Sequence, residues 1–113
     1  MSALDDIAAE RRRQIEVEGW TPEHDDRHER GEMLRAAICY ATNAIVRATL
    51  LAEGKPASFV DKASRSAGVP ASWPWDHGWW KPTDARRNLV KAGALILAEI
   101  ERLDRARTQD TSP

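Results

Sequence analysis

The chain has 113 residues, and its 17 Lys and Arg against 18 Asp and Glu give a formal net charge of −1. This balance indicates no general electrostatic affinity for nucleic acid or for an anionic membrane. The length predicts a single domain, which we place at residues 1–107.

Two further features concern the compartment. Cys39 is the one cysteine, so no internal disulfide can form, as is typical of a reducing cytoplasm. No apolar run reaches the roughly 20 residues that span a bilayer, and the start MSALDDIAAE lacks a signal-peptide pattern. We therefore expect a cytoplasmic protein with no membrane association.

Hydrophobic spacing predicts an all-α helical bundle of three main helices, at about residues 3–18, 22–52 and 84–106. In the first helix Ser2 is the expected N-cap, and Gly19 follows its end. The run Arg11 to Arg13 is interpreted as a solvated face; a phosphate contact is the alternative.

The second helix should begin after Thr21 as N-cap, with Pro22 at its first position, and break near Gly31. Its apolar residues repeat at three- and four-residue intervals, which indicates a buried stripe. The stripe consists of Leu34, Ile38, Ala41, Ile45, Ala48 and Ala52. Cys39 is interpreted as a small core residue.

Residues 57–72 are rich in Ala, Ser, Gly and Pro and predict a loop with one short helical segment at about 57–67. The segment WPWDHGWWKP, residues 73–82, holds four of the five tryptophans and is broken by Pro74 and Gly78 inside it and by Pro82 at its end. We expect an ordered loop pinned by its indoles. Thr83 should cap the last helix, whose stripe is Leu89, Gly93, Ile96, Ile100 and Leu103, and residues 108–113 should form a disordered tail.

The segment TPEHDDRHERGE, residues 21–32, is the densest group of potential ligands. If the helix continued through it, His24, His28 and Glu32 would lie along one line beside the core, and the tryptophan loop could fold over them. These three residues and Asp25 are the candidate ligands of a divalent metal, with Mg²⁺ or Mn²⁺ as the candidate cofactor. The alternative is an acidic helix start whose histidines bond tryptophan or backbone groups.

A nucleotide-like ligand would use both segments. Indoles stack on bases, and cationic side chains with helix-start amides bind phosphate, while carboxylates accept from base amino groups or ribose hydroxyls. The predicted ligand-binding residues are His24, Asp25, Asp26, His28, Glu32, Trp75, Asp76, Trp79, Trp80, Lys81 and Arg86. The alternative for most of the tryptophans is a small core that closes the bundle. No residue is assigned a catalytic role.

Several segments together resemble a family of small accessory proteins encoded by tailed phages and prophages. They are RRRQIEVEGWTPEHDD, the Gly31–Glu32 pair, AAICYA, WPWD, WWKP and LVKAGALILAEIERLDR. The resemblance covers most of the chain except the tail and residues 53–72, which it implies are a variable insert. It implies expression in a bacterial host cell, where such proteins often inhibit host defence by binding an enzyme or by sequestering a nucleotide signal.

A weaker similarity is to the MazG-type all-α nucleotide pyrophosphohydrolases, which hold magnesium with ExxE and ExxD carboxylate pairs. Glu29 with Glu32 forms an ExxE, and Glu101 with Asp104 forms an ExxD. The second pair lies much farther along the chain than in that family.

Three functions follow from the sequence as hypotheses. The leading one is binding of a small phosphate-bearing, nucleotide-derived ligand without turnover. The alternatives are a metal-dependent nucleotide hydrolase and a protein-interaction inhibitor of a host enzyme. Because two long amphipathic helices leave more apolar surface than one small chain covers, we also expect a homo-oligomer.

Overall fold

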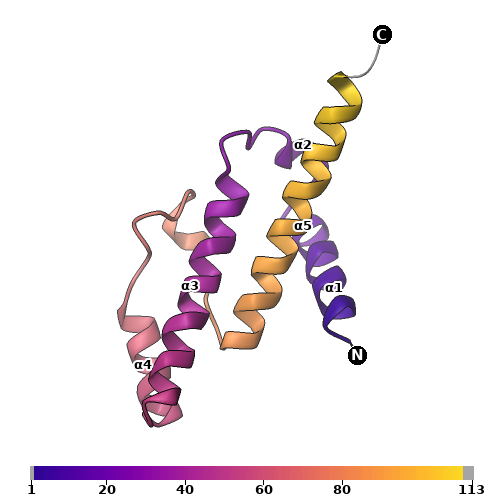
Figure 1. Cartoon of the computed structure of the whole chain (residues 1–113). Helices are drawn as coiled ribbons and strands as arrows, with labels where there is room; N and C mark the ends of the chain where they lie inside the picture. The colour runs from indigo at the N-terminus through magenta and orange to yellow at the C-terminus, as the bar shows by residue number, and fades with distance from the viewer. Residues whose placement is uncertain (1, 111–113) are drawn as a thin grey trace.

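The computed structural model describes the backbone of residues 2–110 and the side chains of residues 2–108. These residues form no strand, and their helices are α1 (Ala3–Glu16), α2 (Pro22–Asp25), α3 (Glu32–Ala52), α4 (Ala57–Ser66), the 3₁₀ helix η1 (His77–Trp79) and α5 (Ala85–Asp110). The expected all-α class is confirmed. Figure 1 shows α3 and α5 side by side in opposite directions, with α1 beside α5 and α4 beside α3.

The predicted helix at 22–52 is interrupted before Gly31, so the expected break near this residue is confirmed. Thr21 caps the short α2, because its Oγ1 accepts from the backbone N–H of His24 at 3.2 Å. The chain then leaves helical geometry until Gly31, whose φ of +77° lies in the left-handed region that favours glycine. The bend changes how the polar segment at residues 21–32 is folded, so the straight-helix projection of its side chains was wrong.

Three smaller boundaries also differ from the prediction or refine it. The short helix expected at 57–67 is present as α4. Asp84, and not Thr83, caps α5, since its Oδ1 accepts from the backbone N–H of Arg87 at 2.8 Å. Helix α5 continues to Asp110, past the expected start of the tail at residue 108. Residues 111–113 lie outside the described part of the chain. None of the helices in that part combines the length and apolar character needed to cross a bilayer.

Small side chains form much of the contact between α3 and α5. The buried apolar residues of these helices are Met33, Ala36, Ala37, Cys39, Tyr40, Ala44, Val90, Ala92, Ala94, Leu95 and Ala98. Because so many of them are alanines, the two helix backbones can approach closely. Gly93 plays a similar part toward α1: a Cβ built on it would lie 3.0 Å from Ile7 Cδ1. The core therefore depends on small residues at helix contacts, and Cys39 is buried in it as expected.

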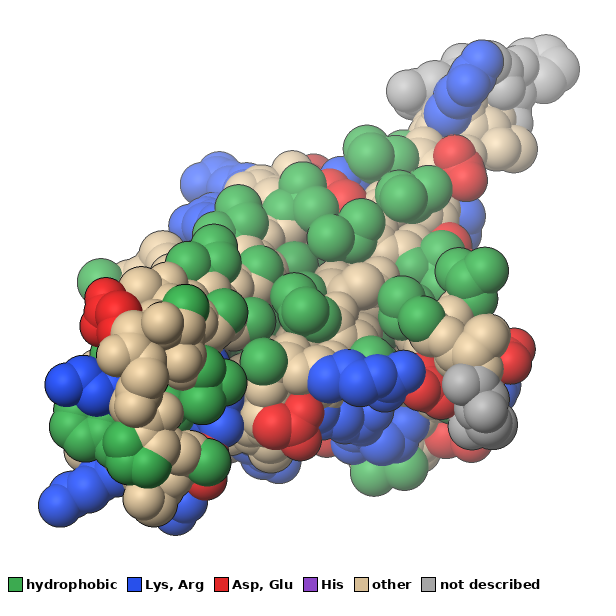
Figure 2. All heavy atoms as spheres, turned by 60° about the horizontal axis from the view of Figure 1, so that its bottom comes forward, with side chains coloured by type: hydrophobic (Ala, Val, Ile, Leu, Met, Phe, Trp, Pro, Cys, Tyr) green, Lys and Arg blue, Asp and Glu red, His purple; other side chains and the backbone are tan. Residues whose placement is uncertain are grey.

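The two stripes predicted to be buried lie mostly at the surface, and that prediction was wrong. Ile38 and Ile45 of α3 are 61% and 64% exposed, and Ile100 of α5 is 50% exposed. The helices meet through the alanine-rich sides instead, since those sides allow the closer approach. Figure 2 shows hydrophobic side chains gathered in a band that extends toward the C-terminal end of α5.

The first helix is held largely by ion pairs, because its apolar face is thin. The guanidinium of Arg11 is buried and donates to Asp25 Oδ2 at 2.7 Å, to Glu101 Oε1 at 3.1 Å and to the carbonyl of Trp20 at 3.2 Å. It thereby joins α1 to the following turn, to α2 and to α5. The interpretation of this arginine as solvated was wrong.

Replacing Arg11 by methionine tests this role. The substitution leaves the buried Asp25 carboxylate without its ion-pair partner, so the free energy of unfolding should fall by about 3–5 kcal/mol. Arg86→Met is the control, because Arg86 is 64% exposed and its pair with Asp6 should contribute at most about 1 kcal/mol. Denaturant unfolding followed by circular dichroism measures both. Equal losses in the two variants would contradict the assigned role of Arg11.

Candidate functional site

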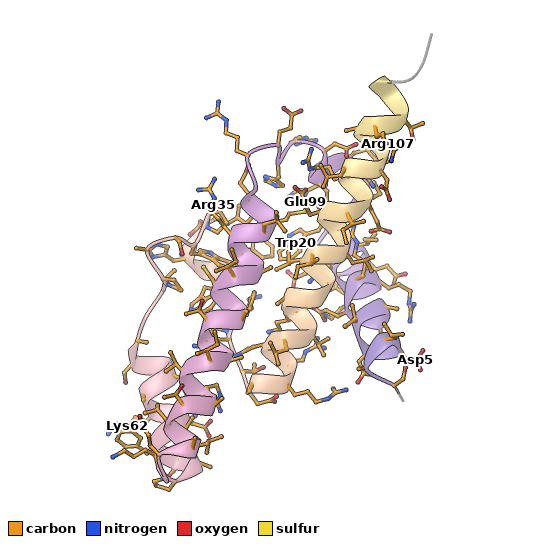
Figure 3. The ribbon with its side chains drawn as sticks, viewed as in Figure 1. Asp5, Trp20, Arg35, Lys62, Glu99 and Arg107 are labelled. Carbon is orange, nitrogen blue, oxygen red and sulfur yellow. The ribbon has the colours of Figure 1, made fainter. Side chains whose placement is uncertain are left out.

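A cavity of about 380 Å³ lies where the α1–α2 connection meets the tryptophan loop. Its lining residues are Glu18, Trp20, His24, Trp75, Asp76 and Trp79. Figure 3 shows Trp20 in projection between the ribbons of α3 and α5, whereas Arg35 lies on the outer side of α3. Aromatic rings form most of the wall, and two carboxylate residues share it.

Two tryptophans anchor the loop at residues 73–82 and leave two others for the cavity. Trp73 is buried, and its Nε1 donates to the carbonyl of Asp76 at 3.1 Å. Trp80 packs on Tyr40 and Trp73, with ring centroids 4.8 and 5.0 Å away. The prediction that indoles pin the loop is confirmed, and Trp75 and Trp79 lie beside the cavity.

The facing wall is set by the end of α1. Gly19, with a φ of +77°, turns the chain, and the backbone N–H of Trp20 donates to the carbonyl of Gln14 at 2.9 Å. The Trp20 ring then lies 5.4 Å from that of Trp75 and 5.9 Å from that of Trp79. Three indoles thus converge on one space.

The sequence prediction did not include Trp20 or Glu18 in the site. A usable signal was present, because Trp20 directly follows the glycine that ends α1 and precedes the polar segment at residues 21–32. That position makes it part of a fixed turn rather than of a helix surface.

The polar segment forms a chain of hydrogen bonds along one side of the cavity. His28 Nδ1 lies 3.2 Å from Glu32 Oε2, the Nε2 atoms of His28 and His24 lie 3.4 Å apart, and His24 Nδ1 lies 3.4 Å from Asp25 Oδ1. Three hydrogen bonds need three protons, and two neutral imidazoles carry two. Two neutral rings therefore supply donors for two of the three contacts at a time.

The three residues of the predicted polar line thus do come together, although the helix that was to align them is broken. Trp75 lies against them, with its ring centroid 5.5 Å from that of His28. The tryptophan loop folds over this segment as predicted.

A cationic recess adjoins the cavity and shares Glu18, Trp20 and Trp79 with it. The remaining lining residues of the recess are Glu10, Arg13, Gln14, Tyr40, Lys81 and Lys91, and its volume is about 20 Å³. Burial lowers the pKa of Lys91, and the nearby positive charge of Arg87 lowers it further. Burial also raises the pKa of Tyr40. The recess therefore places amino and guanidinium groups next to the aromatic cavity.

The other predicted ligand-binding residues have different neighbours. Asp25 pairs with Arg11, Asp26 pairs with Arg105 at 2.7 Å, and Arg86 pairs with Asp6 at 2.7 Å. Trp80 lines a separate cavity of about 240 Å³ next to Cys39. Of the predicted set, His24, Trp75, Asp76 and Trp79 line the aromatic cavity, Lys81 lines the recess, and His28 and Glu32 continue the chain of contacts from His24.

Within the described residues, no group of three or more His, Cys, Asp or Glu side chains is arranged to hold a metal ion. The candidate ligands His24, His28 and Glu32 follow one another in a line, and Asp25 is occupied by Arg11. Comparison of the chain with protein-family models, with curated proteins and with solved structures finds no match.

Glu10, at the base of the recess, makes the stability of the fold depend on pH. Burial alone would raise its pKa, but hydrogen bonds and charge from Arg13, together with the charge of Arg87, outweigh burial and hold the pKa below the ordinary value. A carboxyl whose folded pKa is lowered stabilises the fold above its unfolded pKa, and this contribution is lost as the pH falls through the folded value.

Glu10→Gln should therefore lower the free energy of unfolding at pH 7, and the difference from the unsubstituted chain should shrink progressively below pH of about 4.5. Denaturant unfolding at a series of pH values measures this difference. Glu16→Gln, at an exposed position of the same helix, is the control and should show little effect at any pH. A Glu10→Gln difference that stays constant down to pH 3 would contradict the account.

Proposed function

We propose that the chain binds a small nucleotide-type ligand without turnover, with the base in the tryptophan-lined cavity and the phosphate at the cationic recess. The observation that carries this proposal is the adjacency of the two. Three indoles and two carboxylate residues line the first, and the second is lined by Lys81, Lys91 and Arg13, of which Arg13 is paired with Glu10 and Glu18. A nucleotide has the same two parts in the same order, a flat ring and an anionic group.

The dimensions and surfaces of the cavity suit a base. Its volume of about 380 Å³ falls in the range of about 300–1,000 Å³ found for small-molecule sites. Base stacking on an aromatic side chain contributes about 1–3 kcal/mol.

The carboxylates favour a base that presents N–H donors. Glu18 and Asp76 line the cavity, and Glu18 keeps one oxygen on Arg13 at 2.8 Å. An ionised carboxylate can only accept hydrogen bonds. Guanine, with adjacent ring and exocyclic N–H groups, can donate two to a single carboxylate, so we expect guanine nucleotides to bind more tightly than adenine nucleotides.

The phosphate side is supported by cations that are already positioned. Lys91 Nζ donates to the carbonyl of Lys81 at 2.6 Å, and Lys81 Nζ lies 5.5 Å from the ring centroid of Trp79. Ammonium and guanidinium groups bind phosphate through charge-assisted hydrogen bonds. Because the recess is small, the phosphate would bind at its mouth.

The resemblance to phage accessory proteins suggests a biological role for this binding, namely inhibition of host defence. In the cytoplasm of a bacterial host, a protein that retains a nucleotide without consuming it would sequester a signal of host defence. We rank metal-dependent hydrolysis lower, because Glu32 and Glu101 already bond His28 and Arg11. A metal would have to displace these contacts.

Titration calorimetry with GMP and AMP tests the proposal. GMP should bind and AMP should bind more weakly, while Trp79→Ala should weaken GMP binding by roughly 5- to 150-fold, the equivalent of one lost stacking contact. Trp79 is 39% exposed and does not anchor the loop, so the variant should keep its fold. Phe59→Ala removes an exposed aromatic ring of α4 and is the matched control, with unchanged affinity expected.

Three results would count against the proposal. The first is the absence of binding heat with both GMP and AMP, and the second is an equal loss of affinity in Trp79→Ala and Phe59→Ala. The third is consumption of GTP in the presence of Mg²⁺ or Mn²⁺ that stops on addition of chelator, which would replace simple binding by hydrolysis.

A further inference from the structure

The large aliphatic side chains of α3 and α5 form one surface, which we call the α3–α5 face. Its large members are Leu34, Ile38, Ile45, Leu89, Ile96, Ile100 and Leu103, and their exposed fractions range from 39% to 64%. On each helix they belong to a stripe whose steps alternate strictly between four and three residues. Strict alternation of this kind is the heptad pattern of a helix seam that packs against another helix.

The face lies opposite the cavity. Ile38 and Tyr40 are two residues apart on α3, so they point about 160° away from each other, and Tyr40 is the buried one of the two. On α5, Lys91 lines the cationic recess, and Ile96 lies five residues later, about 140° around the helix. The ligand site and the α3–α5 face are therefore separate surfaces.

The face is large enough for a stable interface. Asn88 of α5 bonds Asn43 of α3, and Lys91 lies over Tyr40, so about 15 residues of each antiparallel helix lie side by side. This paired part presents a surface about 22 Å long and about 20 Å wide, and the remaining length of each helix extends it by one helix width, to about 600 Å² in projection. A standard interface buries about 800 Å² of accessible surface on each partner, and the accessible surface of a ridged helix face exceeds its projection.

The chemistry of the face favours a second copy of this chain. From Leu34 to Ala52 on α3 and from Leu89 to Leu103 on α5, none of the stripe positions is charged, and on α5 the pattern reaches charged residues only at its two ends, Arg86 and Arg107. Homodimer interfaces are more apolar than interfaces between proteins that also exist separately. Interfaces of the second kind are about as polar as the rest of the protein surface. The uncharged centre of the face also gives a different partner nothing to recognise by charge complementarity.

We propose that two copies of the chain pack through their α3–α5 faces into a four-helix bundle related by a two-fold axis. Because α3 and α5 are antiparallel (Figure 1), a two-fold axis in the plane of the interface, along or across the helices, places every helix opposite one that runs the other way. This is the up-and-down arrangement of four-helix bundles. The Ile and Leu side chains of one copy then fill the spaces between those of the other.

Sedimentation equilibrium of the full chain tests the proposal. The unsubstituted protein should show twice the chain mass of 12.7 kDa. Ile38→Lys and Ile96→Lys each place a charge in the apolar contact, and each should raise the dimer dissociation constant at least roughly 100-fold. Val17→Lys is the control, because Val17 is 72% exposed at the end of α1 and away from the face. It should stay dimeric.

A monomeric unsubstituted chain would overturn the proposal, and so would dimers that persist in both Ile38→Lys and Ile96→Lys. If either variant fails to fold, the unsubstituted protein still decides. Isotope-filtered nuclear Overhauser spectra of a mixture of labelled and unlabelled chains should show contacts between copies among the methyl groups of Ile38, Ile45, Ile96 and Ile100. Their absence in a dimer would place the interface elsewhere. Nucleotide binding should survive in the Lys variants, so the two proposals fail independently.

Discussion

The buried guanidinium of Arg11 is the contact on which the arrangement of the molecule depends. Helix α1 has too few apolar residues to be held by burial alone, and this side chain ties it to Asp25 of α2 and Glu101 of α5. The same group donates to the carbonyl of Trp20. Because Trp20 is one wall of the aromatic cavity, an ion pair that fixes the fold also fixes the site. Losing a partner of a buried pair is costly because the other charge stays desolvated.

From this arrangement the molecule acquires two unlike surfaces. On one side the tryptophans divide their work: Trp73 and Trp80 pack on Tyr40 and hold the loop, while Trp75 and Trp79 remain beside the cavity. On the other side, α3 and α5 pack through their alanines, so the large aliphatic side chains of the α3–α5 face are exposed. A site for a small ligand and a surface for a second chain can therefore coexist in a single small domain.

Much of the fold could be predicted from the sequence, because it depends on local signals. Thr21 and Pro22 mark the start of α2, Gly31 marks the break, and the prolines of the tryptophan loop limit regular structure there to the three residues of η1. The side of each helix that is buried could not be predicted in the same way. Hydrophobic spacing selected Ile38 and Ile100, but helix pairing was decided by how closely Ala36 and Ala98 allow the backbones to approach.

Only part of the site could be predicted, because some of its residues are placed by tertiary structure. His24, Trp75 and Trp79 stood out by residue type, whereas Trp20 and Glu18 enter the cavity only through the turn that follows α1. The central claim of the account is that this cavity receives a base. The most direct test follows the nuclear magnetic resonance signals of the indole N–H groups of the five tryptophans during titration with GMP. The account predicts that the signals of Trp20, Trp75 and Trp79 shift together with one dissociation constant, while those of Trp73 and Trp80 move little. Equal shifts in all five, or shifts confined to Trp73 and Trp80, would contradict it.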